Sequence, residues 1–554
     1  MKMVKWVKII IPVFAVVIIG GFILWQVLMS GSSLMSGTGI IAEAKYPEVK
    51  TKPEITEYEN SDGILVGDEY GKAYEAWVTE QFNRLEKEVN AENLYNFFES
   101  SAETFLSESG GENVTYSPLN AYMALSLLAE VTDGESRKQI LDLLENEDVS
   151  ELRKQANEIW NKQYRNDGIV SRIMANSVWL NDEIKYNKET LDLLSNNYYA
   201  SSYSGKMGSD KFNKVIRDWV NSQTKDFLTE QSADIEFAED TILALASTIY
   251  FQGKWSAEFS KEATKSGIFH GESGDVDVKF MNYSDGDVYY WDDKFAAVER
   301  YFEEWGGSMW FILPDEGVSV DEILSEKKYM ELTCNANDWK NQKVLTVNQQ
   351  IPKFDVSSQI DLKDGLIKLG IKDVFDDEVS DFTPLTEDSV VELNKIEHAA
   401  RVSIDEEGVI AAAYTVEIME GEAMPPEEEV DFILDRPFIF VINGEDNIPL
   451  FAGVVKNPSG MSADPVIVSQ RFLKDRDYQE EYTNWDEPVV EVFNGIEEAC
   501  EDSPYGGPFE YTEEYSKAGV IYKVTYNTAN DGLLGPVVVY LDENYVVFGE
   551  QYRE

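Results

Sequence analysis

Two of the residue types that carry much enzyme chemistry are scarce in this sequence. Its 554 residues include two histidines, His270 and His398, and two cysteines, Cys334 and Cys500. Histidine-based zinc sites and Ser-His or Cys-His relays therefore have almost no residues to draw on. The patterns G-x-S-x-G, H-E-x-x-H and G-K-S/T are absent as well. The sequence thus argues against an enzyme, and it predicts neither a metal site nor a cofactor.

One segment has residue types and spacing suited to a change of structure. It reads IDEEGVIAAAYTVEIMEGEAMPPEEEVDF, residues 404–432, with acidic ends and a small apolar centre. Gly408 can supply a flexible pivot. Because alternate residues of a strand face the same side, one face would carry only small or β-branched, uncharged side chains, namely Val409, Ala411, Ala413 and Thr415. The segment could therefore be an exposed loop in one state and a buried strand in another.

Two residues of this segment test that interpretation. Tyr414 would lie on the opposite face, together with Ile410, Ala412 and Val416, where a large side chain is more easily tolerated. Glu417 continues the inward set instead. A buried, unpaired carboxylate costs several kcal/mol, so Glu417 must find a partner there, or insertion must be shallow or poor at that point.

Composition narrows the class of protein. The formal net charge of −56 repels nucleic acid and anionic lipid headgroups, and predicts no nucleic-acid partner. Hydrophobic residues make up 43% of the chain, enough for a large core. The two cysteines lie far apart in the sequence, and we expect them to be unpaired.

The N-terminus predicts a membrane anchor over residues 1–29. Three lysines, at positions 2, 5 and 8, precede the uncharged residues 9–29, a stretch long enough to cross a bilayer. The lysines place the N-terminus in the cytoplasm and the body outside the cell, as a single-pass cell-surface protein. The alternative is a cleaved signal peptide and a secreted protein. No clean small-x-small site follows the apolar stretch, which favours the anchor.

Three further regions follow the anchor. Residues 30–69 are polar and lack apolar periodicity, which predicts an extracellular linker. Residues 70–458 mix helical patterns and apolar strands in no repeating order, which predicts an α+β domain. Residues 459–554 predict a small α+β accessory domain, with a helix over 485–502 and a three-stranded meander over 519–549.

Seven motifs of the large domain resemble the serpin family, in family order from about residue 90 to 458. They are NVTYSPLNAYMALSLLAEVTDGESRKQI (113–140), LALASTIYFQGKW (243–255), SMWFILPDEG (308–317), IPKFDV (351–356), HAARVSIDEEGVIAAA (398–413), RPFIFVI (436–442) and PLFAGVVKNP (449–458). The resemblance implies three β-sheets, eight or nine helices and an exposed reactive loop. It also implies an inhibitor that traps a serine protease as an acyl-enzyme, when the cleaved loop inserts into the main sheet. The alternative is a non-inhibitory serpin-fold binding or adhesion protein.

The resemblance also assigns the loop residues. The family usually cleaves fourteen residues beyond the hinge glycine, which here gives the bond Glu422–Ala423. A glutamate before the bond suggests a glutamate-preferring serine protease, and a small shift of register leaves an elastase-like enzyme possible. The hinge itself comprises Glu406, Glu407, Gly408, Val409, Ala411, Ala412 and Ala413.

A polar cluster is expected where the sheet opens. His398 matches a family histidine beneath this opening, which the family usually pairs with an asparagine. Ser247 stands at the asparagine's position, and a serine hydroxyl can still offer one hydrogen bond. Ser117 and Asn120 belong to the Ser-Pro motif and complete the expected cluster, whose role would be to latch the sheet.

Overall fold

The computed structural model of the chain describes most of residues 39–459 and four later strands. No helix among the described residues is long and apolar enough to span a membrane, and the predicted anchor, residues 1–29, lies outside them. The described residues are 39–53, 55–58, 67–87, 89–107, 112–233, 235–272, 274–387, 391, 393, 396–409, 426, 428–459, 469, 473, 488–493, 520–528, 536–541 and 547–551.

An eight-stranded sheet forms the centre of the body. Its strand order is β1-β5-β4-β6-β14-β13-β12, with β3 paired to β4. The long strands β4 and β6 are buried on both faces, and each carries a mostly apolar central run that is interrupted by a few buried polar residues such as Asn176 and Ser247. The strands are β1 (Gly39–Ala42), β3 (Arg165–Asn166), β4 (Ser171–Asn181), β5 (Ala200–Gly205), β6 (Leu243–Lys254), β12 (Phe354–Asp361), β13 (Ile396–Ile404) and β14 (Gly408–Val409).

Nine further strands of the body form one continuous hydrogen-bonded network in the order β15-β11-β8-β9-β10-β16-β17-β2, with β7 paired to β8. The network narrows at a seam between β8 and β9, which divides it into a sheet of β7, β8, β11 and β15 and a sheet of β9, β10, β16, β17 and β2. Only Tyr289–Trp291 and Ala296–Val298 pair across the seam between β8 and β9. The three sheets of the predicted fold are therefore confirmed. The strands are β2 (Val114–Tyr116), β7 (Lys265–Gly271), β8 (Gly274–Trp291), β9 (Phe295–Tyr301), β10 (Ser308–Pro314), β11 (Gln342–Pro352), β15 (Glu429–Ile433), β16 (Phe438–Asn443) and β17 (Pro449–Val455).

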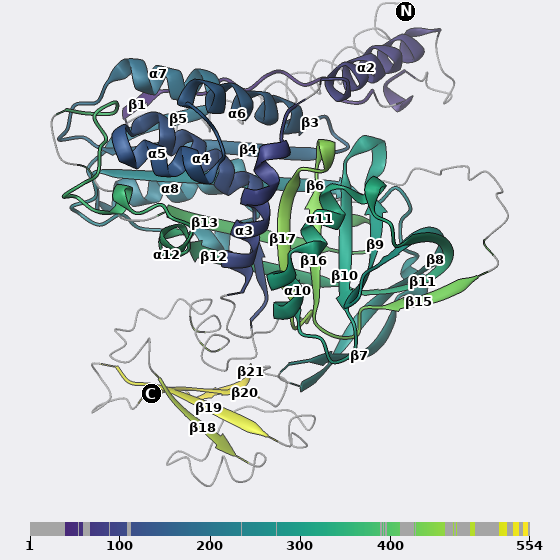
Figure 1. The fold of residues 1–554 in the computed structure, drawn as a ribbon. Helices are drawn as coiled ribbons and strands as arrows, with labels where there is room; N and C mark the ends of the chain where they lie inside the picture. Colours follow the sequence, from purple (N-terminus) through teal and green to yellow (C-terminus); the bar gives the residue numbers. More distant parts are fainter. Residues whose placement is uncertain are drawn as a thin grey trace, which may run out of the picture.

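Helices cover both faces of the eight-stranded sheet. Helix α4 is buried along its whole length, and its sequence is apolar on nearly every side. Helix α8 packs on the opposite face with Trp219 against Trp179 of β4. Figure 1 shows α4–α7 gathered around β4 and β5, away from β8, β11 and β15. The helices are α2 (Glu69–Leu85), α3 (Tyr95–Leu106), α4 (Pro118–Val131), α5 (Gly134–Leu143), α6 (Val149–Gln163), α7 (Lys188–Asn197), α8 (Asp210–Gln223), α9 (Thr229–Ser232), α10 (Val320–Glu326), α11 (Lys328–Cys334) and α12 (Lys363–Lys368).

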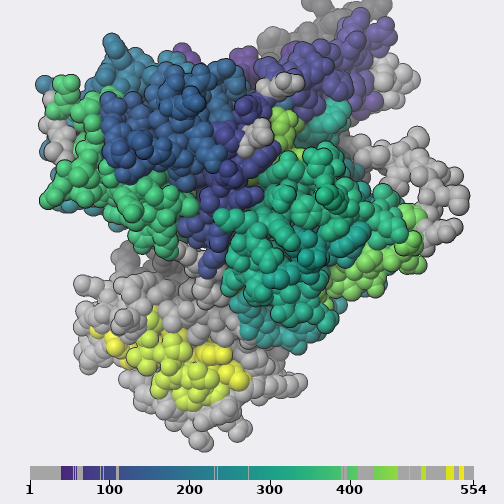
Figure 2. Space-filling view, in the orientation of Figure 1, coloured from purple at the N-terminus to yellow at the C-terminus, as the bar shows by residue number. Residues whose placement is uncertain are grey.

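Part of the predicted linker lies on the body. Strand β1 pairs antiparallel with β5 at the edge of the eight-stranded sheet. The Tyr46 ring stacks on Trp160, with 5.7 Å between ring centroids, and Lys52 forms an ion pair with Glu304. In Figure 2 the blue and teal parts of the body pack directly against each other. Residues 39–53 are thus held by strand pairing, ring stacking and charge.

The C-terminal region contains a separate four-stranded sheet, β18-β19-β20-β21. The predicted helix is wrong over Val489–Phe493, because these residues form β18 and pair with β19. Their sequence, VVEVF, is rich in β-branched and aromatic side chains that favour strands. The rest of that predicted helix lies outside the described residues. The strands are β18 (Val489–Phe493), β19 (Ile521–Tyr526), β20 (Val537–Leu541) and β21 (Val547–Gln551).

A buried ion cluster ties α2 to the core. Glu445 accepts from Arg84 Nη1 at 2.8 Å and from Arg172 Nη2 at 3.1 Å. Burial lowers the pKa of Arg172 to about 10, although Glu445 acts in the other direction. Burial also works against the ionised Glu445, but the two arginines outweigh it and hold its pKa below the usual value. Glu445 and Arg172 are therefore both charged, and each stabilises the charged form of the other.

Replacing Glu445→Gln should destabilise the body. The substitution leaves Arg172 charged, buried and without its counter-ion, which costs about 3 kcal/mol. We expect a clearly lower melting temperature by circular dichroism. Asp142→Asn is the control, because Asp142 and its partner Lys138 are both exposed on α5, and an exposed ion pair contributes little to stability. Equal effects of the two substitutions would contradict this assignment.

Candidate functional site

The expected hinge enters the eight-stranded sheet. Gly408 and Val409 form β14, which pairs antiparallel with Lys254 and Gly253 of β6. On its other side, Val409 pairs with Ile404 of β13. The Val409 side chain is buried in the main core. Gly408 and Val409 thus already occupy a strand position between β6 and β13.

Below β14 the two flanking strands meet over only a short length. Strands β6 and β13 run parallel, and the pairs recorded between them are Leu245 with Ile396 and Ala246 with Glu397. All other pairs in the ladders of β6 and β13 join them to β4, β12 and β14. The sheet is therefore closed by the hinge at one end and by two residue pairs at the other.

Polar contacts fix the turn before the hinge. The Asp405 carboxylate accepts from the backbone N–H of Glu407 at 2.9 Å and of Gly408 at 3.2 Å. Glu406 accepts from Lys353 Nζ and Thr264 Oγ1, both at 2.8 Å. Partial burial opposes ionisation of Glu406, but these hydrogen bonds outweigh it and lower its pKa. Glu407 pairs with Lys261 Nζ at 2.5 Å.

Only glycine fits at position 408. A Cβ atom there would lie 2.2 Å from the carbonyl oxygen of Gly253 and 2.8 Å from Cα of Lys254. The backbone of the turn therefore approaches β6 more closely than any side chain would allow. The remaining expected loop residues, Ala411, Ala412, Ala413, Glu422 and Ala423, lie outside the described residues.

The four residues of the expected polar cluster lie together beneath the sheet. Ser117 caps α4 by accepting from the backbone N–H of Asn120. Asn120 Nδ2 donates to the backbone oxygen of Ser247 at 2.9 Å. The Ser247 hydroxyl lies against Oδ1 of Asn120 and 2.7 Å from Oδ1 of Asn176, so it can donate to either asparagine. All of these side chains are buried.

The histidine of the cluster is bonded differently from the sequence-based expectation. Nε2 of His398 accepts from the backbone N–H of Ser117 at 3.0 Å, so its proton lies on Nδ1. Ser247 turns to Asn120 and Asn176 instead of to His398. Asn176 was missed by the sequence analysis, although a lone amide in the apolar run of β4 was a usable signal. Burial lowers the pKa of His398 to about 4.

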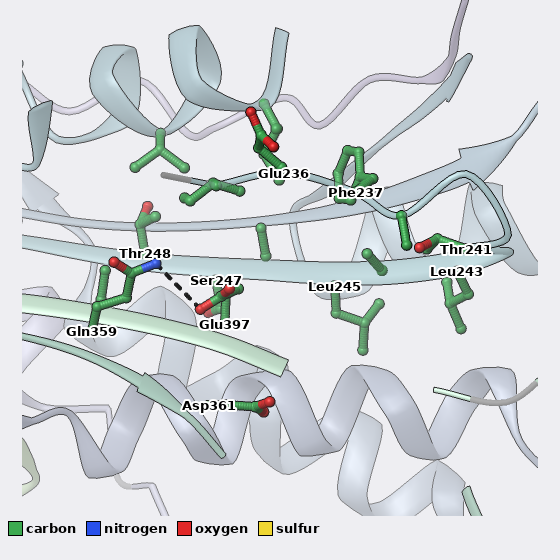
Figure 3. Close-up of a pocket in the computed structure, with 17 residues that line it drawn as sticks. Glu236, Phe237, Thr241, Leu243, Leu245, Ser247, Thr248, Gln359, Asp361 and Glu397 are labelled. Atoms are coloured by element: carbon green, nitrogen blue, oxygen red, sulfur yellow. Dashed lines mark hydrogen bonds between the residues drawn. The ribbon is translucent and has the colours of Figure 1, made fainter. Parts of the chain in front are cut away.

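The opposite face of the sheet holds a cavity of about 260 Å³. Figure 3 shows Glu236 and Phe237 on one side of β6 and Gln359 and Glu397 on the neighbouring strands. Gln359 donates to Glu397 at 3.5 Å. The lining residues are Ile216, Val220, Ile235, Glu236, Phe237, Ala238, Thr241, Leu243, Ala244, Leu245, Ala246, Ser247, Thr248, Gln359, Asp361, Glu397 and Ala399.

Known proteins resemble this chain over the body. Residues 93–458 match the family model described as "Serpin (serine protease inhibitor)". The chain is 28% identical over 377 residues to alpha-1-antiproteinase of Rattus norvegicus, covering 66% of this chain and 89% of that protein. It is 29% identical over 387 residues to a serine protease inhibitor of Cyanea capillata, covering 68% and 99%. The crystal structure of the thermophilic serpin tengpin in its native state superposes with a TM-score of 0.60 at 25% identity, covering 67% and 96%.

Replacing His398→Gln should flatten the dependence of stability on pH. The unfolded histidine binds a proton near pH 6.5, whereas the native one does so only near pH 4. Between these values protonation favours the unfolded state, so stability falls as pH falls, by up to about 3 kcal/mol for this group. Thermal melts of the variant should lose less stability than the wild type between pH 7 and pH 4.

The exposed histidine provides the control for this measurement. His270 is exposed at the surface, with its Nδ1 atom 2.7 Å from Oδ1 of Asp275, so His270→Gln should leave the wild-type pH profile in place. A wild-type slope that persists in His398→Gln would show that other groups carry the acid sensitivity.

Proposed function

Because the chain belongs to the serpin family, we propose that it inhibits serine proteases outside the cell by inserting its cleaved loop into the eight-stranded sheet. The observation that carries this proposal is β14. A hinge that already pairs with β6 and β13 gives the loop a starting point, and strand addition then supplies backbone hydrogen bonds. The protein would act as a substrate that traps its protease, and not as an enzyme.

Continuing the ladder of β14 residue by residue supports this route. Ala411 would lie opposite Phe251, and Ala413 opposite Ile249, where small side chains fit a crowded core face. Thr415 would lie between Ser247 and His398. The threonine hydroxyl would therefore arrive at the polar cluster, which could satisfy its hydrogen bonds.

The same ladder bears on the scissile bond. The first residue of β6, Leu243, would lie opposite Met419. Three more residues lead to Glu422, so a cut at Glu422–Ala423 would use the whole length of β6 and leave a short connection to the trapped protease. We therefore keep this bond as the proposed reactive bond, with a glutamate-preferring or elastase-like target.

The proposed setting is the cell surface. The apolar residues 9–29 would anchor the chain, with its body outside the cell. Cleavage of this segment as a signal peptide would instead release a secreted inhibitor. Alpha-1-antiproteinase of Rattus norvegicus and the serine protease inhibitor of Cyanea capillata carry inhibitor names, which agrees with a protease partner in either setting.

One residue favours a second function, a non-inhibitory serpin-fold binding protein. The ladder would set Glu417 between Leu245 and Ile396, which are 5% and 3% exposed. A carboxylate in that apolar position costs several kcal/mol unless it is protonated or paired. Insertion that stalls above Glu417 would leave the loop as a substrate, and the body would then serve only as a binding scaffold.

A panel of serine proteases tests the inhibitory function. We expect the full chain to form a complex that survives boiling in detergent, and to release a fragment that mass spectrometry finds to begin at Ala423. Thr415→Arg should be cut at the same bond without complex formation, because a charge would be buried beside His398. Thr415→Ser is the control, because it keeps the hydroxyl at the polar cluster, and it should retain trapping. Cleavage of the wild type without any complex across the panel would overturn the proposal.

Thermal stability before and after cleavage separates the two candidates. An inserting loop adds a buried strand, so we expect the melting temperature to rise strongly once the loop is cut. Glu417→Ala should increase this rise, because it removes the buried carboxylate. The matched control is Glu420→Ala, which should not increase it, because position 420 would lie beyond the end of β6. An unchanged melting temperature after cleavage would favour the scaffold function.

A further inference from the structure

The cavity beneath α8 has a floor of small residues. Its floor is formed by Ala246 and Thr248 of β6 and by Ala399 of β13, all of which line the cavity. The Thr248 hydroxyl has no hydrogen-bond partner among the described residues. At about 260 Å³, the cavity exceeds the roughly 150 Å³ that accepts benzene in an engineered protein, and it lies below the roughly 300–1,000 Å³ of drug-sized ligand sites. Its size therefore suits one aromatic ring with a small neighbour.

Its roof is apolar, and its edges carry acceptors. Ile216 and Val220 of α8, with Phe237 from the segment before β6, form the apolar side. Glu236 and Asp361 bring carboxylates to the edges, beside the hydrogen-bonded pair of Gln359 and Glu397. A buried ring with one hydroxyl matches this environment, because a buried phenol needs an acceptor for its proton.

If the strand pairing of β14 is extended along the loop, one tyrosine ring comes to lie at the cavity. Continued in register, it sets Tyr414 between Thr248 and Ala399. Directly opposed residues on neighbouring strands point to the same face. Both flanking residues line the cavity, so the side chain of Tyr414 would enter it through the floor. Val416 would follow between Ala246 and Glu397, the next pair on the same face.

We propose that this cavity is the receptor for the Tyr414 side chain of the inserted loop. The inference rests on the proposed function, and it identifies a residue that determines how firmly the inserted state is held. As the new strand enters, β6 and β13 separate by about one strand spacing, roughly 4.8 Å, which widens the floor while α8 still covers it. The outward face of the loop at Tyr414 is therefore a binding position and not a solvent-exposed one.

The site explains why a large aromatic residue is tolerated in a run of alanines. An alanine at position 414 would leave the roof of Ile216, Val220 and Phe237 without contacts, and an unfilled cavity is costly. Tyr414 supplies the missing ring. Ile410 of the outward set does not share this role, because it would lie between Gln252 and Ser403, which do not line the cavity. Val416 would lie between two lining residues, Ala246 and Glu397, and its smaller side chain would neighbour the ring.

A double-mutant cycle tests the receptor. The melting temperature of the full chain is measured before and after loop cleavage, for the wild type, Tyr414→Ala, Ile216→Ala and the double variant. We expect Tyr414→Ala to reduce the rise on cleavage by at least about 4 °C, and Ile216→Ala to reduce it less once Tyr414 is absent. Tyr414→Phe should retain most of the rise. Ile410→Ala is the matched control on the same face and should show no coupling to Ile216.

Two further results separate this inference from the proposed function. A wild-type chain that gains no stability on cleavage overturns both. A wild-type gain that is unchanged in Tyr414→Ala, with additive effects in the cycle, overturns the receptor alone. Should Ile216→Ala fold poorly, Ala399→Leu fills the cavity from its floor. It should reduce the rise in the wild type and leave that of Tyr414→Ala unchanged, and equal effects in both would overturn the receptor.

Discussion

The body is organised around a strand position that is only partly filled. Strands β6 and β13 pair directly through two residue pairs at one end, and β14 separates them at the other. A backbone hydrogen bond contributes little individually, so a sheet closed over so short a length can be reopened by a competing strand. If the cleaved loop inserts as proposed, the native arrangement would be less stable than the cleaved one, and its lifetime would be a kinetic property.

The two faces of that position are chemically different. Beneath it, Ser247 and His398 hold a polar network to the cap of α4, so the core face at this level requires hydrogen bonds. Above it, small side chains form the floor of the cavity, and apolar side chains of α8 cover it. A strand that enters must therefore alternate in character at Thr415 and Tyr414. Two neighbouring residues of the loop thus match two unlike surfaces.

The sequence predicted more about the fold than about contacts within the site. Ordered motifs identified the three-sheet body, because apolar strands and caps are local patterns. Long-range contacts carried no such signal: the bond from Ser117 to His398 joins residues far apart in the chain, and it displaces the expected bond to Ser247. The predicted helix at Val489–Phe493 failed because β-branched residues decide the structure of so short a segment. Pairing of β1 with β5 was missed because a short edge strand has no periodicity of its own.

In a membrane-anchored chain, the edge strand β1 would limit the distance between the body and the bilayer. Residues 39–53 lie along the body, so they are unavailable as a spacer. If residues 9–29 span a membrane as proposed, only residues 30–38 remain between the span and the start of β1, and nine residues extend at most about 30 Å. The body of a protein tethered in this way would remain close to the bilayer surface. It would meet proteases that are themselves close to the membrane, and it would hold a captured one there.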